Sequence, residues 1–94
     1  MTFFSVRKAI EINELIGIKY GAPYGVLDQA ALGFALKKGP LKMMKLIIKN
    51  NPFVDGNKRT ALALYVMAKE DKILSEVWDD LHEIFLALKE EKKI

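Results

Sequence analysis

The chain has 94 residues, of which 51% are hydrophobic and 29% are charged, and its net charge is +3. This balance predicts one small globular domain, 1–94, and excludes an intrinsically disordered chain. The absence of cysteine excludes disulfides and thiolate metal sites. The longest apolar run, 61–68, is far shorter than the roughly 20 residues of a membrane span, and no signal peptide is evident. We therefore expect a cytoplasmic protein without a membrane partner.

The first part of the chain predicts two helices separated by a turn. Apolar residues recur at helical spacing within 5–20, and Gly21 is suited to end that helix. The composition of 21–25, GAPYG, is typical of a turn. Asp28 is suited to cap a short helix that runs to about Lys37. Neither segment shows the alternation of a strand.

The second part predicts three further helices. Pro40 suits the first turn of a helix over 41–50, and a loop follows it. Residues 57–70 are apolar nearly all round, which predicts a central, buried helix. Ser75 is suited to cap a last helix. The inner face of that helix is predicted to consist of Val77, Leu81, Ile84 and Leu88. The predicted fold is a single compact all-α domain of about five helices.

Charge is distributed unevenly along the chain. Residues 1–69 contain eleven Lys and Arg against four Asp and Glu, whereas residues 70–94 contain four against eight. The basic part includes five lysines with no acid between them: Lys37, Lys38, Lys42, Lys45 and Lys49. Such a run can attract nucleic acid, but it more often forms a solvated helix face. Few aromatic residues interleave with the lysines and no helix-turn-helix pattern is present, so we do not expect nucleic acid as a partner.

The most informative stretch is NPFVDGNKRTA, residues 51–61. It predicts a loop that opens the next helix, where free backbone N–H groups favour an anion such as phosphate. Lys58 and Arg59 add positive charge, and the Asn57 amide can donate to a phosphate oxygen. Asp55 would repel a phosphate unless a cation lay between them, so we interpret it as a Mg²⁺ ligand. The chemistry alone leaves an alternative equally open, in which Asp55 caps the helix and the two cations are ordinary surface residues.

This stretch resembles the signature of the Fic/Doc family, H-x-F-x-D-[GA]-N-[GK]-R. Its Lys58-Arg59-Thr60-Ala61 ending resembles the Doc branch, the toxins of type II toxin–antitoxin modules. Residues 20–36, YGAPYGVLDQAALGFAL, are similar to the Doc-branch turn and the helix after it. The resemblance implies an all-α fold that grips ATP by its phosphates and, with Mg²⁺, transfers phosphate or AMP to a hydroxyl of a target protein such as elongation factor Tu. It also implies a Phd-like antitoxin as partner.

The resemblance carries roles onto individual residues of the motif. Phe53 is the implied anchor of the loop, and Asp55 is the implied magnesium ligand. Gly56 and Asn57 are implied to contact phosphate, and Lys58 and Arg59 are implied to bind its charge. The family's first motif residue is a histidine that serves as general base, and Asn51 stands in its place. An amide can orient a hydroxyl but cannot take its proton, and loss of a general base typically lowers the rate about 10²–10⁴-fold. His82, the only histidine, is placed by the helical pattern on the polar side of the last helix, and we do not expect it to replace the base.

Three hypotheses follow from the sequence. The first is a Doc-like toxin with weak or absent turnover because of Asn51. The second is a Fic/Doc relative that only binds nucleotide or a partner helix. The third, and the least supported, is a basic helical module that binds nucleic acid.

Overall fold

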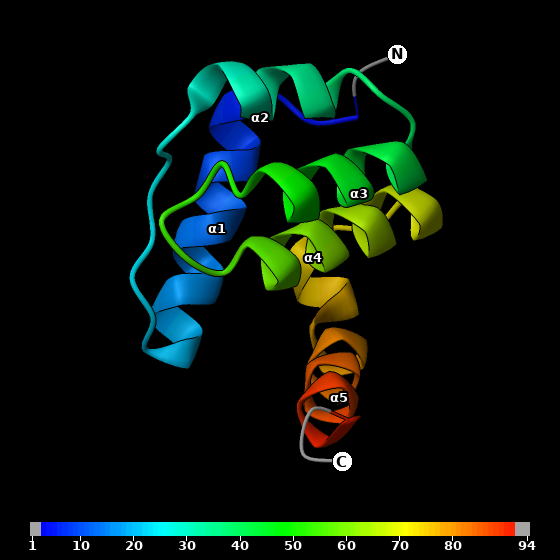
Figure 1. Ribbon diagram of the computed structural model, residues 1–94. Helices are drawn as coiled ribbons and strands as arrows, with labels where there is room; N and C mark the ends of the chain where they lie inside the picture. The colour runs from blue at the N-terminus through cyan, green and yellow to red at the C-terminus, as the bar shows by residue number, and fades with distance from the viewer. Residues whose placement is uncertain (1–2, 92–94) are drawn as a thin grey trace.

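The computed structural model describes the backbone of residues 3–91 and the side chains of residues 3–89. In this part of the chain the regular elements are five helices (Figure 1), which are α1 (Val6–Tyr20), α2 (Gln29–Leu36), α3 (Pro40–Asn50), α4 (Asn57–Glu70) and α5 (Leu74–Glu91). The predicted all-α domain of about five helices is confirmed. None of these helices, within the part described, is both long and apolar enough to cross a membrane.

Local chemistry explains where the first three helices begin and end. The C-cap of α1 is Gly21, whose φ of 65° is a left-handed conformation that glycine adopts without strain. The side chain of Asp28 accepts a hydrogen bond from the Ala31 N–H at 2.9 Å and so caps α2. Pro40 occupies the first turn of α3. The predicted end of α1 at Gly21 and the predicted starts of α2 and α3 at Asp28 and Pro40 are confirmed.

The start of α5 corrects one prediction. Ser75 does not cap this helix, because the helix begins at Leu74 and Ser75 lies inside its first turn. The start of the helix is instead capped by the side chain of Glu76, whose Oε1 accepts a hydrogen bond from the Ile73 N–H at 3.1 Å. A carboxylate three residues beyond the cap makes this bond in a capping box, and here it acts without a capping hydroxyl.

The inner face of α5 is only partly as predicted. Val77 and Leu81 are fully buried, but the next buried position is Phe85, four residues further along the same face. Ile84 and Leu88 are half-buried at its edge. In the view of Figure 1 the C-terminal half of α5 extends beyond the other helices, which explains why the burial of its apolar face fades along the helix.

The central helix of the fold is α4, as predicted. It packs against α1, α3 and α5, and Figure 1 shows it between them. Its buried positions include small side chains at its start and larger ones further along, with Ala61, Ala63 and Leu64 all completely buried. The alanines allow neighbouring helices to approach closely, while the larger side chains fill the space between them.

The loop between α3 and α4 is held against the turn between α1 and α2 by backbone pairing. Val26 and Phe53 form an isolated antiparallel bridge. The Val54 N–H donates to the Gly25 carbonyl at 2.8 Å, and the Pro52 carbonyl accepts from the Leu27 N–H at 2.7 Å. Two segments that lie far apart in the sequence therefore support each other without forming a sheet.

A buried amide, Asn13, joins this pairing to the helices. Its side chain is 1% exposed, and every hydrogen bond it makes crosses to another part of the chain. Nδ2 donates to the Asp55 carbonyl at 2.9 Å and to Thr60 Oγ1 at 3.1 Å, while Oδ1 accepts from the Gly25 N–H at 2.9 Å. One side chain of α1 thus fixes the turn, the loop and the first turn of α4.

We predict that Asn13→Ala destabilises the fold by about 2–3 kcal/mol, because it leaves the Asp55 carbonyl and the Gly25 N–H without their partner. Asn50→Ala is the matched control, since Asn50 is exposed at the end of α3 and its loss is expected to cost less than about 0.5 kcal/mol. Urea unfolding followed by circular dichroism measures both. Equal midpoints for the two variants would contradict the role given to Asn13.

Candidate functional site

The motif loop, residues 51–56, begins and ends in left-handed conformations. Asn51 is the C-cap of α3 with φ 47° and ψ 58°, and its N–H donates to the Ile47 carbonyl. Asparagine tolerates this conformation better than most residues, which is a structural reason for an amide at this position. At the other end Gly56 has φ 70°, and a Cβ there would lie 3.5 Å from Asn13 Nδ2. Both conformations turn the chain sharply between α3 and α4.

Phe53 and Asn57 hold the loop in shape. Phe53 is 1% exposed and packs in the core. The Asn57 amide pairs with the backbone of Phe53, since Oδ1 accepts from its N–H at 2.9 Å and Nδ2 donates to its carbonyl at 3.0 Å. Asn57 therefore has a bracing role that the sequence did not indicate. One N–H of its amide stays available for the phosphate contact that the sequence predicts.

Asp55 stands at the exposed tip of the loop. Its Oδ1 accepts from the Gly56 N–H at 2.7 Å, which turns the carboxylate toward the start of α4. Gly56 is the N-cap of α4 and carries no side chain, so no side-chain cap covers the N–H groups of the first turn. Those N–H groups and the positive end of the helix dipole remain open to an anion.

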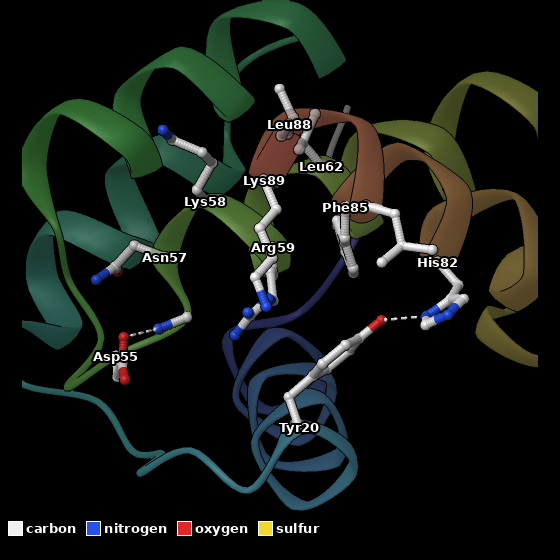
Figure 2. A pocket seen from close by; sticks show the side chains of 12 residues that line it. Tyr20, Asp55, Asn57, Lys58, Arg59, Leu62, His82, Phe85, Leu88 and Lys89 are labelled. Atoms are coloured by element: carbon white, nitrogen blue, oxygen red, sulfur yellow. Dashed lines mark hydrogen bonds between the residues drawn. The ribbon is translucent and has the colours of Figure 1, made fainter. Parts of the chain in front are cut away.

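This loop opens into a pocket of about 410 Å³, which we call the motif pocket. Figure 2 shows that it lies between the loop, the first turn of α4, the end of α1 and the outer part of α5. Its polar end is lined by Asp55, Gly56, Asn57, Lys58 and Arg59. Its other walls are lined by Tyr20, Leu62, His82, Phe85, Leu86, Leu88 and Lys89. The pocket thus combines a cationic end with an apolar wall.

Tyr20 contacts pocket residues from two other helices, α4 and α5. The guanidinium carbon of Arg59 lies 4.5 Å from the centroid of its ring. Its hydroxyl lies 3.0 Å from Nδ1 of His82, whose ring is inclined by 23° to that of Tyr20 with the ring centroids 6.2 Å apart (Figure 2). Its ring also meets Phe85 edge-on at 5.7 Å. Residues from α1, α4 and α5 are therefore fixed relative to one another at one point.

The structure brings together five of the seven residues that the sequence marks as functional. Residues 55–59 share the motif pocket, as neighbours in the chain and on one helix start. Phe53 is in the core beneath them, where the resemblance implies a buried anchor. Asn51 is exposed, and it is not among the residues that line the pocket. The position that would hold the general base therefore stands apart from the pocket wall.

Sequence reasoning missed Tyr20, His82 and Lys89 as site residues. They come from α1 and α5, and only tertiary packing brings them beside the motif. His82 is exposed, as predicted, but it faces the motif pocket rather than open solvent alone. A weak signal existed for Tyr20, because the helical spacing of α1 continues the core face of Ile12 and Ile16 to this position.

The lysine run forms a separate cationic surface. Lys42, Lys45 and Lys49 are exposed on α3, and none of the five lysines lines the motif pocket. Lys38 is half-buried, with Nζ 4.4 Å from the centroid of the Phe34 ring. The Phe34 ring is exposed beside this surface, and Lys38 lies over one of its faces.

The described residues include no group of three or more His, Cys, Asp or Glu side chains that could hold a metal ion. Among the described side chains, Asp55 is the carboxylate that lines the pocket. Mg²⁺ commonly binds one or two carboxylates and takes its remaining ligands from water and substrate phosphates. A cation at Asp55 therefore fits only together with a phosphate ligand.

Comparisons of the chain with protein-family models, with curated proteins and with solved structures found no match. What the chain does must therefore be inferred from the motif and from the pocket.

We predict that Asn57→Ala loosens the loop, because it removes both hydrogen bonds to Phe53. The amide hydrogen of Phe53 should exchange with solvent distinctly faster, and the free energy of unfolding should fall by about 1–3 kcal/mol. Lys58→Ala, one residue along and exposed, is the control and should change neither quantity measurably. Hydrogen exchange followed by NMR measures the difference. An unchanged exchange rate at Phe53 would contradict the bracing role.

Proposed function

We propose that the chain is a Doc-like toxin of the Fic/Doc family, part of a type II toxin–antitoxin module, whose motif pocket binds the phosphates of ATP. The reaction is transfer of phosphate or AMP to a hydroxyl of a target protein such as elongation factor Tu. The observation that carries the proposal is that residues 55–59, chosen from the sequence alone, line one pocket together with a further cation, Lys89 of α5. Because these five residues are consecutive, the support comes from the side chains of α1 and α5, among them Tyr20 and Lys89, that complete the pocket around them.

The chemistry of the pocket favours phosphate over other anions. The uncapped backbone N–H groups at the start of α4 and the side chains of Lys58, Arg59 and Lys89 all line the motif pocket. A phosphate chain offers several charged oxygens to donors spread in this way, whereas a single carboxylate can satisfy only some of them. The apolar wall formed by Leu62, Phe85 and Leu88 suits the uncharged part of a nucleotide.

Asp55 is the residue that would hold Mg²⁺. Its Oδ1 is engaged by the Gly56 N–H, which fixes the carboxylate and leaves the second oxygen for a cation. Bound with ATP, the ion would supply neutralisation of the phosphate charge. The role of the chain itself is to orient the phosphates on the start of α4 and to keep Asp55 beside them.

The weak point of catalysis is Asn51. It cannot act as a general base, and in the structure it serves as a helix cap outside the pocket wall. We therefore expect the chain as it stands to turn over slowly or not at all. This same observation favours the second candidate function, a Fic/Doc relative that binds nucleotide or a partner helix without chemistry.

The proposal includes a separate Phd-like antitoxin as partner. The excess of Lys and Arg over residues 1–69 favours an acidic segment. An apolar groove between α1 and α5, lined by Leu15, Ile18, Leu74 and Trp78, offers a surface on which the apolar face of such a segment could be buried.

We predict magnesium-dependent binding of ATP by the motif pocket. Arg59→Ala should raise the Kd roughly 10- to 100-fold, the range expected for hydrogen bonds to a charged group. Asp55→Ala should remove the dependence on Mg²⁺, because no other described carboxylate lines the pocket. Isothermal titration calorimetry of the chain with ATP, with and without Mg²⁺, measures both.

The chain offers matched controls for these two changes. Arg7→Ala removes the only other arginine, which is exposed on α1, and Asp80→Ala removes an exposed carboxylate of α5 that does not line the pocket. Both controls should bind ATP as the unchanged chain does. Equal Kd values for Arg59→Ala and Arg7→Ala would rule out the phosphate clamp.

We predict that Asn51→His raises the rate of transfer by roughly 10²–10⁴-fold, the effect attributed to a general base. The substitution should be tolerated, because position 51 is exposed and histidine is among the residues that adopt its left-handed backbone. Transfer from labelled ATP to lysate proteins and growth after induction are the measurements. A histidine variant that binds ATP but transfers nothing would favour the binding-only relative.

A further inference from the structure

Arg59 lies against an aromatic face in the pocket, and none of the described carboxylates pairs with it. Its guanidinium lies 4.5 Å above the ring of Tyr20. The ion pairs among the described side chains are Lys8 with Glu11 and Lys72 with Glu70. Arg59 therefore forms no ion pair with a described carboxylate. A carboxylate partner would compete with a phosphate for the same N–H donors, whereas a ring holds the cation through its face and leaves those donors at the edge free.

Tyr20 is in turn fixed from the opposite side by α5. Its hydroxyl is hydrogen-bonded to His82 at 3.0 Å, and its ring packs on Phe85 and on Trp78, whose centroid is 6.2 Å away. Because Tyr20 is the last residue of α1, these contacts fix the ring at the point where the helix ends. Figure 2 shows the ring between Arg59 and His82, with the hydroxyl directed at the imidazole.

We propose that Tyr20 is a positioning residue, which holds the guanidinium of Arg59 ready for the phosphate groups of a ligand. The packing of its ring on Phe85 holds Tyr20 in place, and the hydrogen bond of the hydroxyl to His82 makes a smaller addition. The inference rests on the proposed function, because it assigns to Arg59 the role of phosphate clamp. It adds a residue outside the motif, on a different helix, on which the affinity of that clamp depends.

The expected size of the effect follows from side-chain entropy. Ordering a flexible side chain when a ligand binds weakens binding by an amount that corresponds to about 2- to 12-fold in Kd. If Tyr20 already orders Arg59, that cost is absent in the unchanged chain and returns when the ring is removed. The effect should depend on the ring much more than on its hydroxyl.

A double-mutant cycle tests the proposal on the full chain. The variants are Tyr20→Leu, Tyr20→Phe, Arg59→Ala and the Tyr20→Leu/Arg59→Ala pair. The two probes are Mg²⁺–ATP and Mg²⁺–tripolyphosphate, and the readout is the Kd from calorimetry. Tyr24→Leu is the matched control, since it makes the same change at an exposed tyrosine that does not line the motif pocket. Circular dichroism establishes that each variant is folded, and Tyr20→Met replaces Tyr20→Leu if the leucine variant is not.

Tyr20→Leu is expected to weaken both probes about 2- to 12-fold, while Tyr20→Phe and Tyr24→Leu stay within about twofold of the unchanged chain. In the Arg59→Ala background, Tyr20→Leu should have no further effect, because Tyr20 acts through the arginine. A loss confined to ATP would mean that the ring contacts the nucleoside, and this would overturn the inference. So would an additive double variant, or an equal loss in Tyr24→Leu. A chain that binds neither probe would overturn the proposed function itself.

Discussion

The architecture around the motif pocket depends on one buried amide. Asn13 is surrounded by the apolar face of α1, and a polar side chain in that position is tolerated only if its hydrogen-bonding groups are paired. Its partners are the turn before α2, the loop before α4 and the first turn of α4 itself. Satisfying one side chain therefore requires these three segments to meet at one place, which fixes the start of α4 against α1.

The motif pocket is a consequence of that constraint. Because the loop is fixed to the middle of α1, the first turn of α4 projects toward the end of the same helix, where Tyr20 stands. The outer part of α5 closes the pocket with His82 and Lys89. Bonds within the loop, from Asn57 to Phe53 and from Asp55 to Gly56, then set the direction of its backbone. Rigid support of this kind is what a phosphate site needs, since its donors must be in place before the ligand binds.

Much of the fold could be predicted because it depends on short-range signals. The cap at Asp28 and the proline at the start of α3 act within one turn of the chain. The helical spacing of apolar residues predicts the helices that lie between such signals. The prediction that Ser75 caps α5 was wrong. Serine is a common cap, and the bond that the Ile73 N–H donates to Glu76 leaves no separate signal in the sequence. The polar end of the pocket was predictable because its residues are consecutive. Tyr20 and His82 were not, because their place is set by how α1 and α5 pack. Asn13 carried a signal that was not used, since it is the one amide on the buried stripe of α1.

The central claim is that phosphate binds at the start of α4 and not elsewhere on this basic chain. A titration with Mg²⁺–ATP followed by ¹⁵N–¹H NMR tests it directly, because every backbone amide reports separately. The account predicts the largest shifts at the amides of 56–59, with smaller ones at the α5 residues of the pocket. Shifts centred on the exposed lysines of α3, Lys42, Lys45 and Lys49, would show non-specific attraction of a polyanion and would contradict the account.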